Sequence, residues 1–231
     1  MFIVIKKRML MIAAIVLIAI LLCAGATAGA LAFSPDTDAV VVLDAGHGGI
    51  DGGCAGVESK VSEAAINLIL AKKVAALLKE QGIGAVLTRE NEKGLYTETV
   101  SFKRQDMAAR KKIILDAAPK LVVSIHCNKF PDPSRRGAQV FFEPLSEHGK
   151  TLADALQNNL NTLNAEYARR NFTALKGDYY ILHCSSYPSA IVECGFLSNA
   201  EDDKLLNTEE YQNMLAYRIF CGITGYLSTT E

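Results

Sequence analysis

The chain is poor in several residue types and patterns that would point to particular protein classes. Its 231 residues include no tryptophan, only four histidines, and six cysteines without CxxC spacing. The cysteine spacing excludes a zinc ribbon and argues against a disulfide framework. No internal repeat, low-complexity tract or long linker interrupts residues 40–227. One domain of ordinary size is therefore expected.

Positive charge is also scarce. The chain has 24 lysines and arginines against 25 acidic residues. Three of the basic residues (Lys6, Lys7 and Arg8) lie near the N-terminus, which leaves 24 − 3 = 21 basic against 25 acidic residues, a net charge of −4. No remaining basic run is longer than three residues. The sequence therefore predicts no nucleic-acid partner.

The N-terminal segment lacks charge over an unusual length. An almost wholly apolar run from Met9 to Phe33 follows the three basic residues, which is the layout of an export signal. Ala30-Leu31-Ala32 offers a small-x-small cleavage site, so residues 1–33 are predicted to be a signal peptide. The alternative is a retained anchor that associates with the membrane through residues 9–33. Both interpretations place residues 34–231 outside the cytoplasm, either secreted or membrane-anchored.

Apolar runs alternate with helical patterns through the rest of the chain. The helical patterns lie at residues 66–78, 107–117, 152–163 and 211–223, and Thr208 is the predicted N-cap of the last one. This alternation predicts an α/β fold, a single layered domain with a mainly parallel, about six-stranded sheet flanked by helices. The predicted strands are Ala39–Leu43, Ala85–Leu87, Leu121–Ile125, Ala138–Phe142, Tyr179–Leu182 and Ala190–Val192.

Ionisable residues fall where three of these strands end. His47 follows the first strand in a glycine-rich turn, His126 closes the third and Glu193 closes the last. Ligands of α/β folds collect beyond the carboxyl ends of the strands, so the three side chains are expected at one rim of the sheet. The turn around His47 lacks the glycine order of a nucleotide-binding loop, which favours a ligand histidine over a phosphate cradle.

Glu63 completes a candidate metal site. It lies in the first turn of the first predicted helix, where side chains lean back toward the N-terminus and so toward His47. Taken alone, Glu63 could simply favour the helix dipole. Together, His47, Glu63 and His126 form a donor set that suits one catalytic Zn²⁺ with an open fourth position. Zinc would activate a water molecule and polarise a carbonyl group, and Glu193 would act as the general base.

A cysteine nucleophile is the first alternative. Cys127 and Cys194 adjoin His126 and Glu193, and a Cys–His hydrolase would use one of them as a thiolate. Adjacent strand residues point to opposite faces, which separates each thiol from its polar neighbour. The second alternative is a catalytically silent binding module or accessory protein.

Four motifs, in this order, carry a resemblance to a known family: GHGGIDGG, SEAAINL, SIHCN and IVECGFLSN. The chain resembles the zinc-dependent N-acetylmuramoyl-L-alanine amidases of bacterial cell walls, the amidase-3 family, over residues 40–227. The resemblance implies hydrolysis of the amide between N-acetylmuramic acid and L-alanine in peptidoglycan. It also implies zinc ligation by His47, Glu63 and His126, with Glu193 as the catalytic carboxylate.

The compact domain with a signal and no wall-binding repeats is most similar to the spore germination-specific subgroup. That similarity implies a role in spore cortex maturation, in which stem peptides are removed so that muramic lactam can form. It also implies a location in the spore intermembrane or cortex space. A vegetative autolysin is the alternative within the family, and a catalytically silent peptidoglycan-binding or accessory protein is the alternative to an enzyme. The stretch Asn91–Ser101 is too short for the regulatory helix of some members, so the site is expected to be open or completed by an accessory protein.

The chain departs from the family pattern at Ala45, Ala64, Cys127 and Cys194, none of which removes a ligand or the base. Three residues are further candidates for substrate contact. Asn128 follows His126, His183 closes the predicted strand Tyr179–Leu182, and Arg169 could meet the carboxylates of the stem peptide. Ordinary turn hydrogen bonding or a solvated helix end would account equally well for Asn128 and Arg169.

Overall fold

The structure, a computed structural model, describes residues 40–97 and 99–229. The predicted export signal at residues 1–33 lies outside the described residues. No helix within them combines the length and apolar character needed to cross a membrane.

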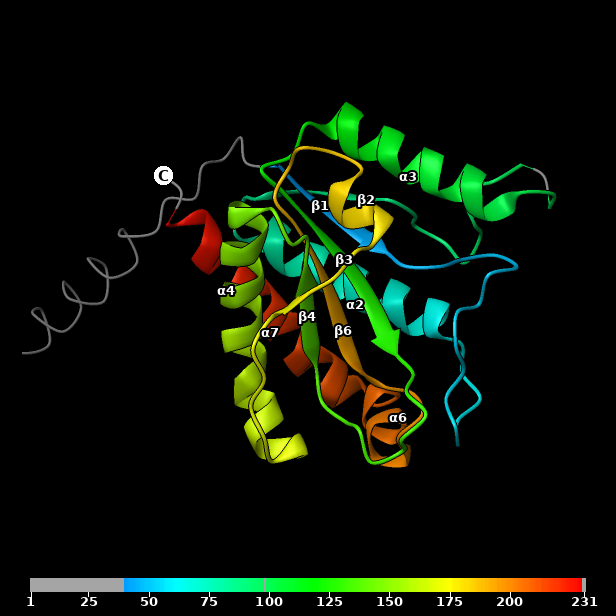
Figure 1. Cartoon of the computed structure of the whole chain (residues 1–231), viewed down its shortest axis with the longest axis vertical. Coiled ribbons are helices and arrows are strands. Elements are labelled where there is room, and N and C mark those ends of the chain that lie inside the picture. Colours follow the sequence, from blue (N-terminus) through cyan, green and yellow to red (C-terminus); the bar gives the residue numbers. More distant parts are fainter. Residues whose placement is uncertain (1–39, 98, 230–231) are drawn as a thin grey trace, which may run out of the picture. The chain divides into compact units, whose positions relative to one another are not determined.

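A six-stranded sheet forms the centre of the domain (Figure 1). Its strands lie in the order β2-β1-β3-β6-β4-β5. The pairings are parallel except for β4 against β6, which is antiparallel. The predicted mainly parallel sheet of about six strands is confirmed. The strands are β1 (Val40–Ala45), β2 (Gly84–Leu87), β3 (Leu121–Asn128), β4 (Gln139–Phe142), β5 (Leu175–Lys176) and β6 (Ser189–Phe196).

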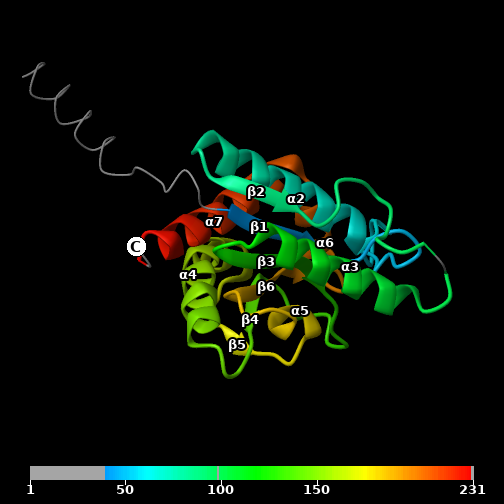
Figure 2. The ribbon, with the colours of Figure 1, turned by 90° about the horizontal axis from the view of Figure 1, so that it is seen from above.

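Helices cover both faces of this sheet (Figure 2). One face packs against α2 (Glu63–Glu80), α4 (Glu147–Leu163) and α7 (Glu209–Leu227), and together they form the large apolar core. The short helix α6 (Ala200–Leu206) precedes α7, and a π-helix, η1 (Asn164–Ala168), extends α4. The other face carries α3 (Phe102–Ala117) and the four-residue helix α5 (Tyr180–His183) over a smaller core.

Strand alternation decides which side chains face the site. In β3, Val123, Ile125 and Cys127 lie in the large core, whereas Val122 belongs to the smaller core. Because side chains alternate, His126 shares the α3 side of the sheet with Val122. By the same period, Asp44 shares that side with Val42 in β1, and Glu193 shares it with Ile191 in β6.

Two strand predictions need correction. Tyr179–Leu182 was expected to be a strand but forms most of α5, and the edge position beside β4 belongs to Leu175–Lys176. A four-residue apolar run does not distinguish a buried strand from a helical turn, and here Ile181 and Leu182 pack into the smaller core as a helical turn. His126 and Glu193 were expected to close their strands, but β3 and β6 continue to Asn128 and Phe196.

Candidate metal centre

His47 lies in the loop that follows the carboxyl end of β1. His47 has a positive φ of 62°, which is uncommon for a residue with a side chain. Gly46 precedes it, and a Cβ atom there would overlap the His126 ring. Glycine at this position therefore allows the backbone to pass close to His126. The two imidazole rings lie edge to face with their centroids 4.9 Å apart.

Glu63 joins the two histidines. As the first residue of α2, it extends its side chain toward the turn, and its Oε1 lies 3.2 Å from His47 Nε2 and 2.9 Å from His126 Nδ1. Backbone amides fix the carboxylate: Cys54 N donates to Oε2 at 3.0 Å and Cys127 N donates to Oε1 at 3.2 Å. The Glu63 side chain is nearly inaccessible to solvent, so these contacts hold a buried charge.

The chemistry of the three donors fits a divalent cation. Their ligand atoms all lie within 4.8 Å of one another. The lone pairs of two neutral imidazoles and a carboxylate repel one another unless a proton or a cation lies between them. Burial lowers the pKa of His47, but Glu63 and Asp51 outweigh it and raise that pKa to about 8. Burial raises the pKa of Glu63, but His126 and His47 hold it well below its usual range.

Asp51 contacts the ring nitrogen of His47 that faces away from Glu63. Its Oδ1 lies 3.1 Å from His47 Nδ1, while His47 Nε2 faces Glu63. The same oxygen accepts a hydrogen bond from Gly53 N at 3.3 Å. A carboxylate on the distal nitrogen fixes the tautomer and the ring orientation of a metal-ligating histidine.

Glu193 lies beside the three-residue cluster without joining it. It is the direct partner of His126 in the parallel register between β3 and β6. Its Oε2 is buried and has no hydrogen-bond partner. Burial raises the pKa of Glu193 to about 7, with a further increase from Glu63, against the opposing charges of His126 and His47. An unpartnered carboxylate with a pKa near neutrality can exchange protons.

Two buried arginines hold the His47 loop from the other side. Arg110 of α3 is fully buried and donates to the carbonyl oxygens of Ala45 at 2.9 Å and His47 at 2.7 Å. Arg89 donates to Gly46 O at 3.0 Å and to Ala45 O at 2.9 Å. Five guanidinium donors in a rigid fork suit this role, because several backbone acceptors can be satisfied at once.

Two aspartates balance the charge of Arg110. Asp106, one turn earlier on α3, accepts from Arg110 Nε at 2.6 Å, and Asp44 of β1 pairs with Nη1. Ser124 and Thr88 donate hydroxyl hydrogen bonds to Asp44 at 2.5 and 2.7 Å. Burial raises the pKa of Asp44, but Arg110 and the two hydroxyls lower it to about 2. This buried polar network was not anticipated from the sequence.

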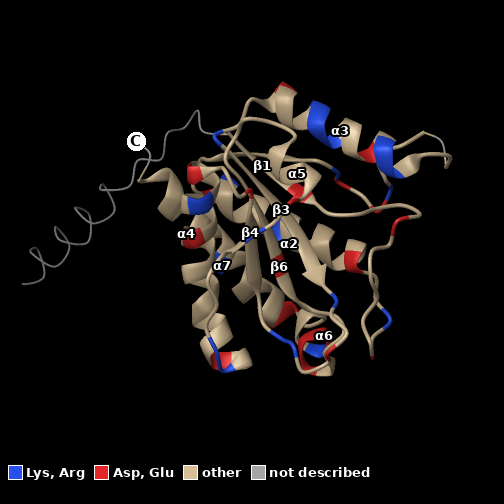
Figure 3. Ribbon diagram, viewed as in Figure 1, with Lys and Arg blue, Asp and Glu red and all other residues tan. Residues whose placement is uncertain are grey.

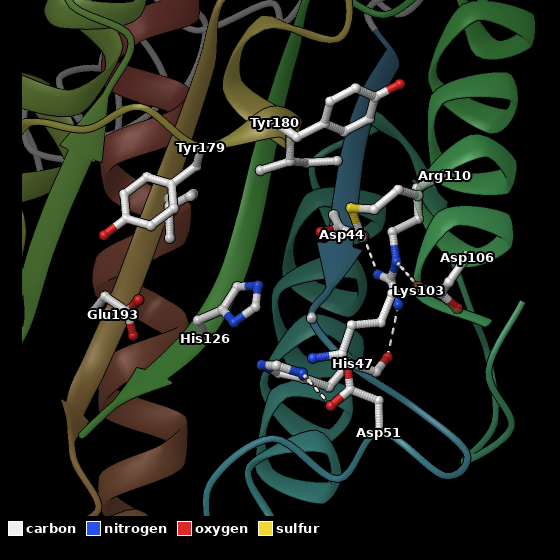
Figure 4. Close-up of a pocket in the computed structure, with 14 residues that line it drawn as sticks. Asp44, His47, Asp51, Lys103, Asp106, Arg110, His126, Tyr179, Tyr180 and Glu193 are labelled. Atoms are coloured by element: carbon white, nitrogen blue, oxygen red, sulfur yellow. Dashed lines mark hydrogen bonds and ion pairs between the residues drawn. The ribbon is translucent and has the colours of Figure 1, made fainter. Parts of the chain in front are cut away.

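A cavity of about 370 Å³ opens onto the cluster (Figure 4). It lies between the carboxyl ends of β1, β3 and β6 on one side and α3 and α5 on the other. Its lining combines the polar groups described above with an apolar wall. The lining residues are Asp44, Gly46, His47, Asp51, Lys103, Asp106, Met107, Arg110, His126, Tyr179, Tyr180, Ile181, Ile191 and Glu193.

The three residues predicted to contact substrate lie outside this lining. Asn128 Oδ1 accepts a hydrogen bond from the next backbone amide, Lys129 N, at 2.7 Å. His183 closes α5, and its half-exposed side chain faces Asp178 at 3.4 Å. Arg169 follows η1 and lines a separate groove that includes Glu201.

The cysteines are arranged as structural residues. Cys127 and Cys194 lie in the large core, on the opposite face from His126 and Glu193, as strand alternation predicts. Burial raises the pKa of both thiols. Burial and the Glu63 charge also raise the pKa of Cys54 to about 12. A thiolate nucleophile is therefore disfavoured at all three positions.

Comparison with known proteins agrees with this arrangement. The model of the N-acetylmuramoyl-L-alanine amidase family matches residues 41–225, nearly the whole described domain. The chain belongs to this family. The family predicted from the four motifs is thus confirmed, and the chain is an N-acetylmuramoyl-L-alanine amidase, a hydrolase of peptidoglycan.

Curated members of the amidase family align with most of the chain. The germination-specific N-acetylmuramoyl-L-alanine amidase of Bacillus subtilis is 33% identical over 198 residues, which cover 84% of this chain and 82% of the relative. The amidase AmiA of Escherichia coli is 27% identical over 232 residues, which cover 81% of this chain and 75% of the relative.

Solved amidase structures share the fold. The CwlD amidase from Clostridioides difficile, in complex with the GerS lipoprotein, superposes with a TM-score of 0.77 at 36% identity, covering 83% of this chain and 99% of that one. The amidase AmiC2 of Nostoc punctiforme gives a TM-score of 0.70 at 32% identity, covering 83% and 98%. The likeness extends over the whole of these amidase domains.

Proposed function

We propose that this amidase uses one zinc ion, held by His47, Glu63 and His126, to cleave the amide between N-acetylmuramic acid and L-alanine. Glu193 is the general base. One observation carries the proposal: three donor atoms from separate elements converge within 4.8 Å, beside a carboxylate that shares none of their hydrogen bonds.

The donor set favours zinc. Two imidazoles and one carboxylate match the ligands of hydrolytic zinc sites, and three protein ligands leave one position open. When bound, Zn²⁺ would polarise the scissile carbonyl and make the attacking water more acidic, and its charge would also favour ionised Glu193. Asp51 holds His47 in the orientation that this ligation needs, with Nε2 toward Glu63.

Glu193 carries the proton. Ionised Glu193 accepts a proton from the water that attacks the carbonyl carbon and then donates it to the nitrogen of the leaving L-alanine amine. Amine protonation lets the C–N bond break, and the carboxyl group of the lactyl moiety forms. The buried, unpartnered Oε2 of Glu193 suits this exchange because no resident hydrogen bond has to break first.

Two substitutions separate metal binding from proton transfer. We expect Glu193→Ala to keep zinc and to lose at least about a hundredfold in kcat, the usual contribution of a general base. His126→Ala is expected to lose zinc and activity together, whereas His148→Ala, at an exposed position in α4, should lose neither.

The measurement combines metal analysis with mass spectrometry of muropeptides, incubated with zinc-loaded and with chelator-treated protein. Retained turnover in Glu193→Ala would remove Glu193 from the base role. Activity that survives chelation but not a thiol reagent would favour a cysteine nucleophile instead.

A role in spore cortex maturation is the biological part of the proposal. It is supported by the alignment with the germination-specific amidase of Bacillus subtilis and by the resemblance to the CwlD amidase. The chain should restore muramic lactam to spores of a Bacillus subtilis strain that lacks its germination-specific amidase, and Glu193→Ala should not. Cleavage of vegetative peptidoglycan without lactam restoration would favour an autolysin.

We also propose that the enzyme acts after export, together with an accessory protein. The support is the predicted signal at residues 1–33 and the solved complex of the CwlD amidase with a lipoprotein. Residues 34–231 co-expressed with GerS should elute as a complex in size-exclusion chromatography. Independent elution of the two proteins, with full amidase activity of the chain alone, would remove GerS-type proteins as partners.

A further inference from the structure

Among the described residues, the lining of the cavity at the candidate metal centre includes one basic side chain that forms no ion pair. Asp44 and Asp106 are paired with Arg110, and Asp51 is paired with His47. Lys103 is the remaining basic side chain of the lining, and it makes no ion pair with any described residue. Its Nζ lies 6.0 Å from the centroid of the neighbouring Phe102 ring.

Lys103 lies within electrostatic range of the cluster. Its side chain extends from α3 toward the part of the cavity where His47 and Asp51 lie (Figure 4). Lys103, His47 and Asp51 all line this cavity. An anion held by Lys103 would therefore lie in the same cavity as the reacting groups.

The position of Lys103 on its helix is electrostatically unfavourable. Lys103 and Arg104 lie in the first turn of α3, which carries no acidic residue, and basic residues continue along the helix (Figure 3). The N-terminus of a helix already carries partial positive charge, so cations there are disfavoured. Asp106 of the same helix is paired with Arg110, and among the described residues no carboxylate forms an ion pair with Lys103, so a bound carboxylate would offset this repulsion.

Part of the cavity lining is apolar. Met107 of α3 and Tyr180 and Ile181 of α5 contribute to it. A ligand that fills the cavity should therefore carry a small apolar group near the reacting carbonyl and a negative group toward Lys103. An alanine followed by an acidic residue has this pattern.

The chemistry of the substrate fixes which side carries the charge. The carboxyl group of the muramic acid residue is consumed in the scissile amide, so the sugar side is neutral. Carboxylates occur on the peptide side. We propose that Lys103 is a specificity-determining residue that binds the carboxylate of the residue following L-alanine in the stem peptide. This inference rests on the proposed amide cleavage and assigns to Lys103 the carboxylate contact that was expected of Arg169.

The test uses two muropeptides that differ in one group. Both have the same glycan, and the residue after alanine carries either a free carboxylate or a carboxamide. The wild-type enzyme should prefer the carboxylate by about fivefold in kcat/KM, the upper range for a solvent-exposed ion pair. The preference should lie in KM. Lys103→Met should abolish it, and Lys103→Arg should retain it.

Arg104→Met is the matched control, since Arg104 is the exposed neighbour on the same turn and does not line the cavity. It should keep the preference. An equal loss on both substrates in Lys103→Met would overturn the inference, because the lysine would then act on the reaction common to both. A wild-type enzyme without preference would also overturn it.

Calorimetry keeps the two proposals distinguishable. If the wild-type enzyme cleaves neither muropeptide, the proposed function fails, and binding decides the role of Lys103. The carboxylate muropeptide should bind Glu193→Gln more tightly than Glu193→Gln/Lys103→Met by about fivefold. Equal affinities would remove Lys103 from substrate recognition.

Discussion

The two faces of the sheet bury different kinds of side chain. The face under α2, α4 and α7 is a continuous apolar core in which residues such as Leu156 and Val123 are fully buried. The face under α3 and α5 has a small apolar cluster beside a buried network of Asp44, Arg110 and Asp106. The first face contributes Glu63 at the start of α2, and the second supplies the polar network that holds the His47 loop.

This difference separates stability from function. Apolar burial is non-directional, so the large core stabilises the fold without fixing any one loop. Hydrogen bonds are directional, and the Arg110 guanidinium links α3 to the backbone of Ala45 and His47. Substitutions in the face under α3 and α5 (the polar face) should therefore change both the unfolding free energy and the metal affinity. Substitutions in the core under α2, α4 and α7 (the apolar face) should change the unfolding free energy alone. Four predictions test this comparison.

The largest effect is expected at Arg110. Arg110→Met leaves Asp44 and Asp106 buried without their cation and frees the His47 carbonyl, so we expect a loss of about 4 kcal/mol in unfolding free energy. Zinc affinity should fall as well. Urea unfolding and chelator competition measure the two quantities.

Lys112→Met is the control on the same helix, because the Lys112–Asp116 pair is mostly exposed and contributes less than about 0.5 kcal/mol. Unchanged zinc affinity in a folded Arg110→Met variant would contradict the coupling.

Leu156→Ala tests the other face. Leu156 is fully buried in α4, and its truncation leaves a cavity that should cost about 3 kcal/mol. Because no part of α4 touches the cluster residues through a hydrogen bond, zinc affinity of the folded variant should stay at the wild-type value. The same two measurements apply, and a parallel loss of zinc affinity would show that the faces are not separate.

Acid should weaken the polar face specifically. The pKa of Asp44 is about 2 in the folded chain against an ordinary value of 3.8. A lowered folded-state pKa stabilises the protein fully above pH 4, and the contribution is lost as the pH falls toward 2. The shift corresponds to about 2 kcal/mol.

Urea unfolding between pH 5 and pH 2, with chelator present throughout, should show a loss of stability that is about 2 kcal/mol larger in the wild-type protein than in Asp44→Asn. Parallel pH profiles for the two proteins would remove Asp44 as the source.

The smallest effect is expected at Asp51. Asp51→Asn keeps the size of the side chain but weakens the contact to His47 Nδ1, so zinc affinity should fall by about tenfold. Asp154→Asn on α4 is the control and should bind zinc normally. An unchanged zinc dissociation constant in Asp51→Asn would limit the positioning of His47 to Arg110 and Arg89.

Much of the candidate site could be predicted because its signals are local. His47 lies in a glycine-rich turn, Glu63 in the first turn of a periodic helix, and His126 and Glu193 in strands of alternating pattern. Each signal spans a few residues. The strand alternation also placed Cys127 and Cys194 in the core, where the structure has them.

Other parts depended on contacts between distant segments. Asp44 and Arg110 are 66 residues apart, and neither has a local pattern that reveals the other. Arg169 and Lys103 are both exposed basic residues near helix ends, so the sequence alone gave no reason to prefer Lys103. The run Tyr179–Leu182 lies mostly in α5, where Ile181 and Leu182 pack into the smaller core, and Leu175–Lys176 pairs with β4 at the edge of the sheet.

The amino-acid sequence by itself determined the alternation of strands and helices, the two faces of each strand, and the four side chains offered to the metal site. Tertiary structure alone decided which charges are neutralised within the chain and which one remains for a substrate. The physical reason is range: backbone periodicity and turn geometry act over a few residues, whereas charge pairing requires the folded chain to bring distant groups into contact.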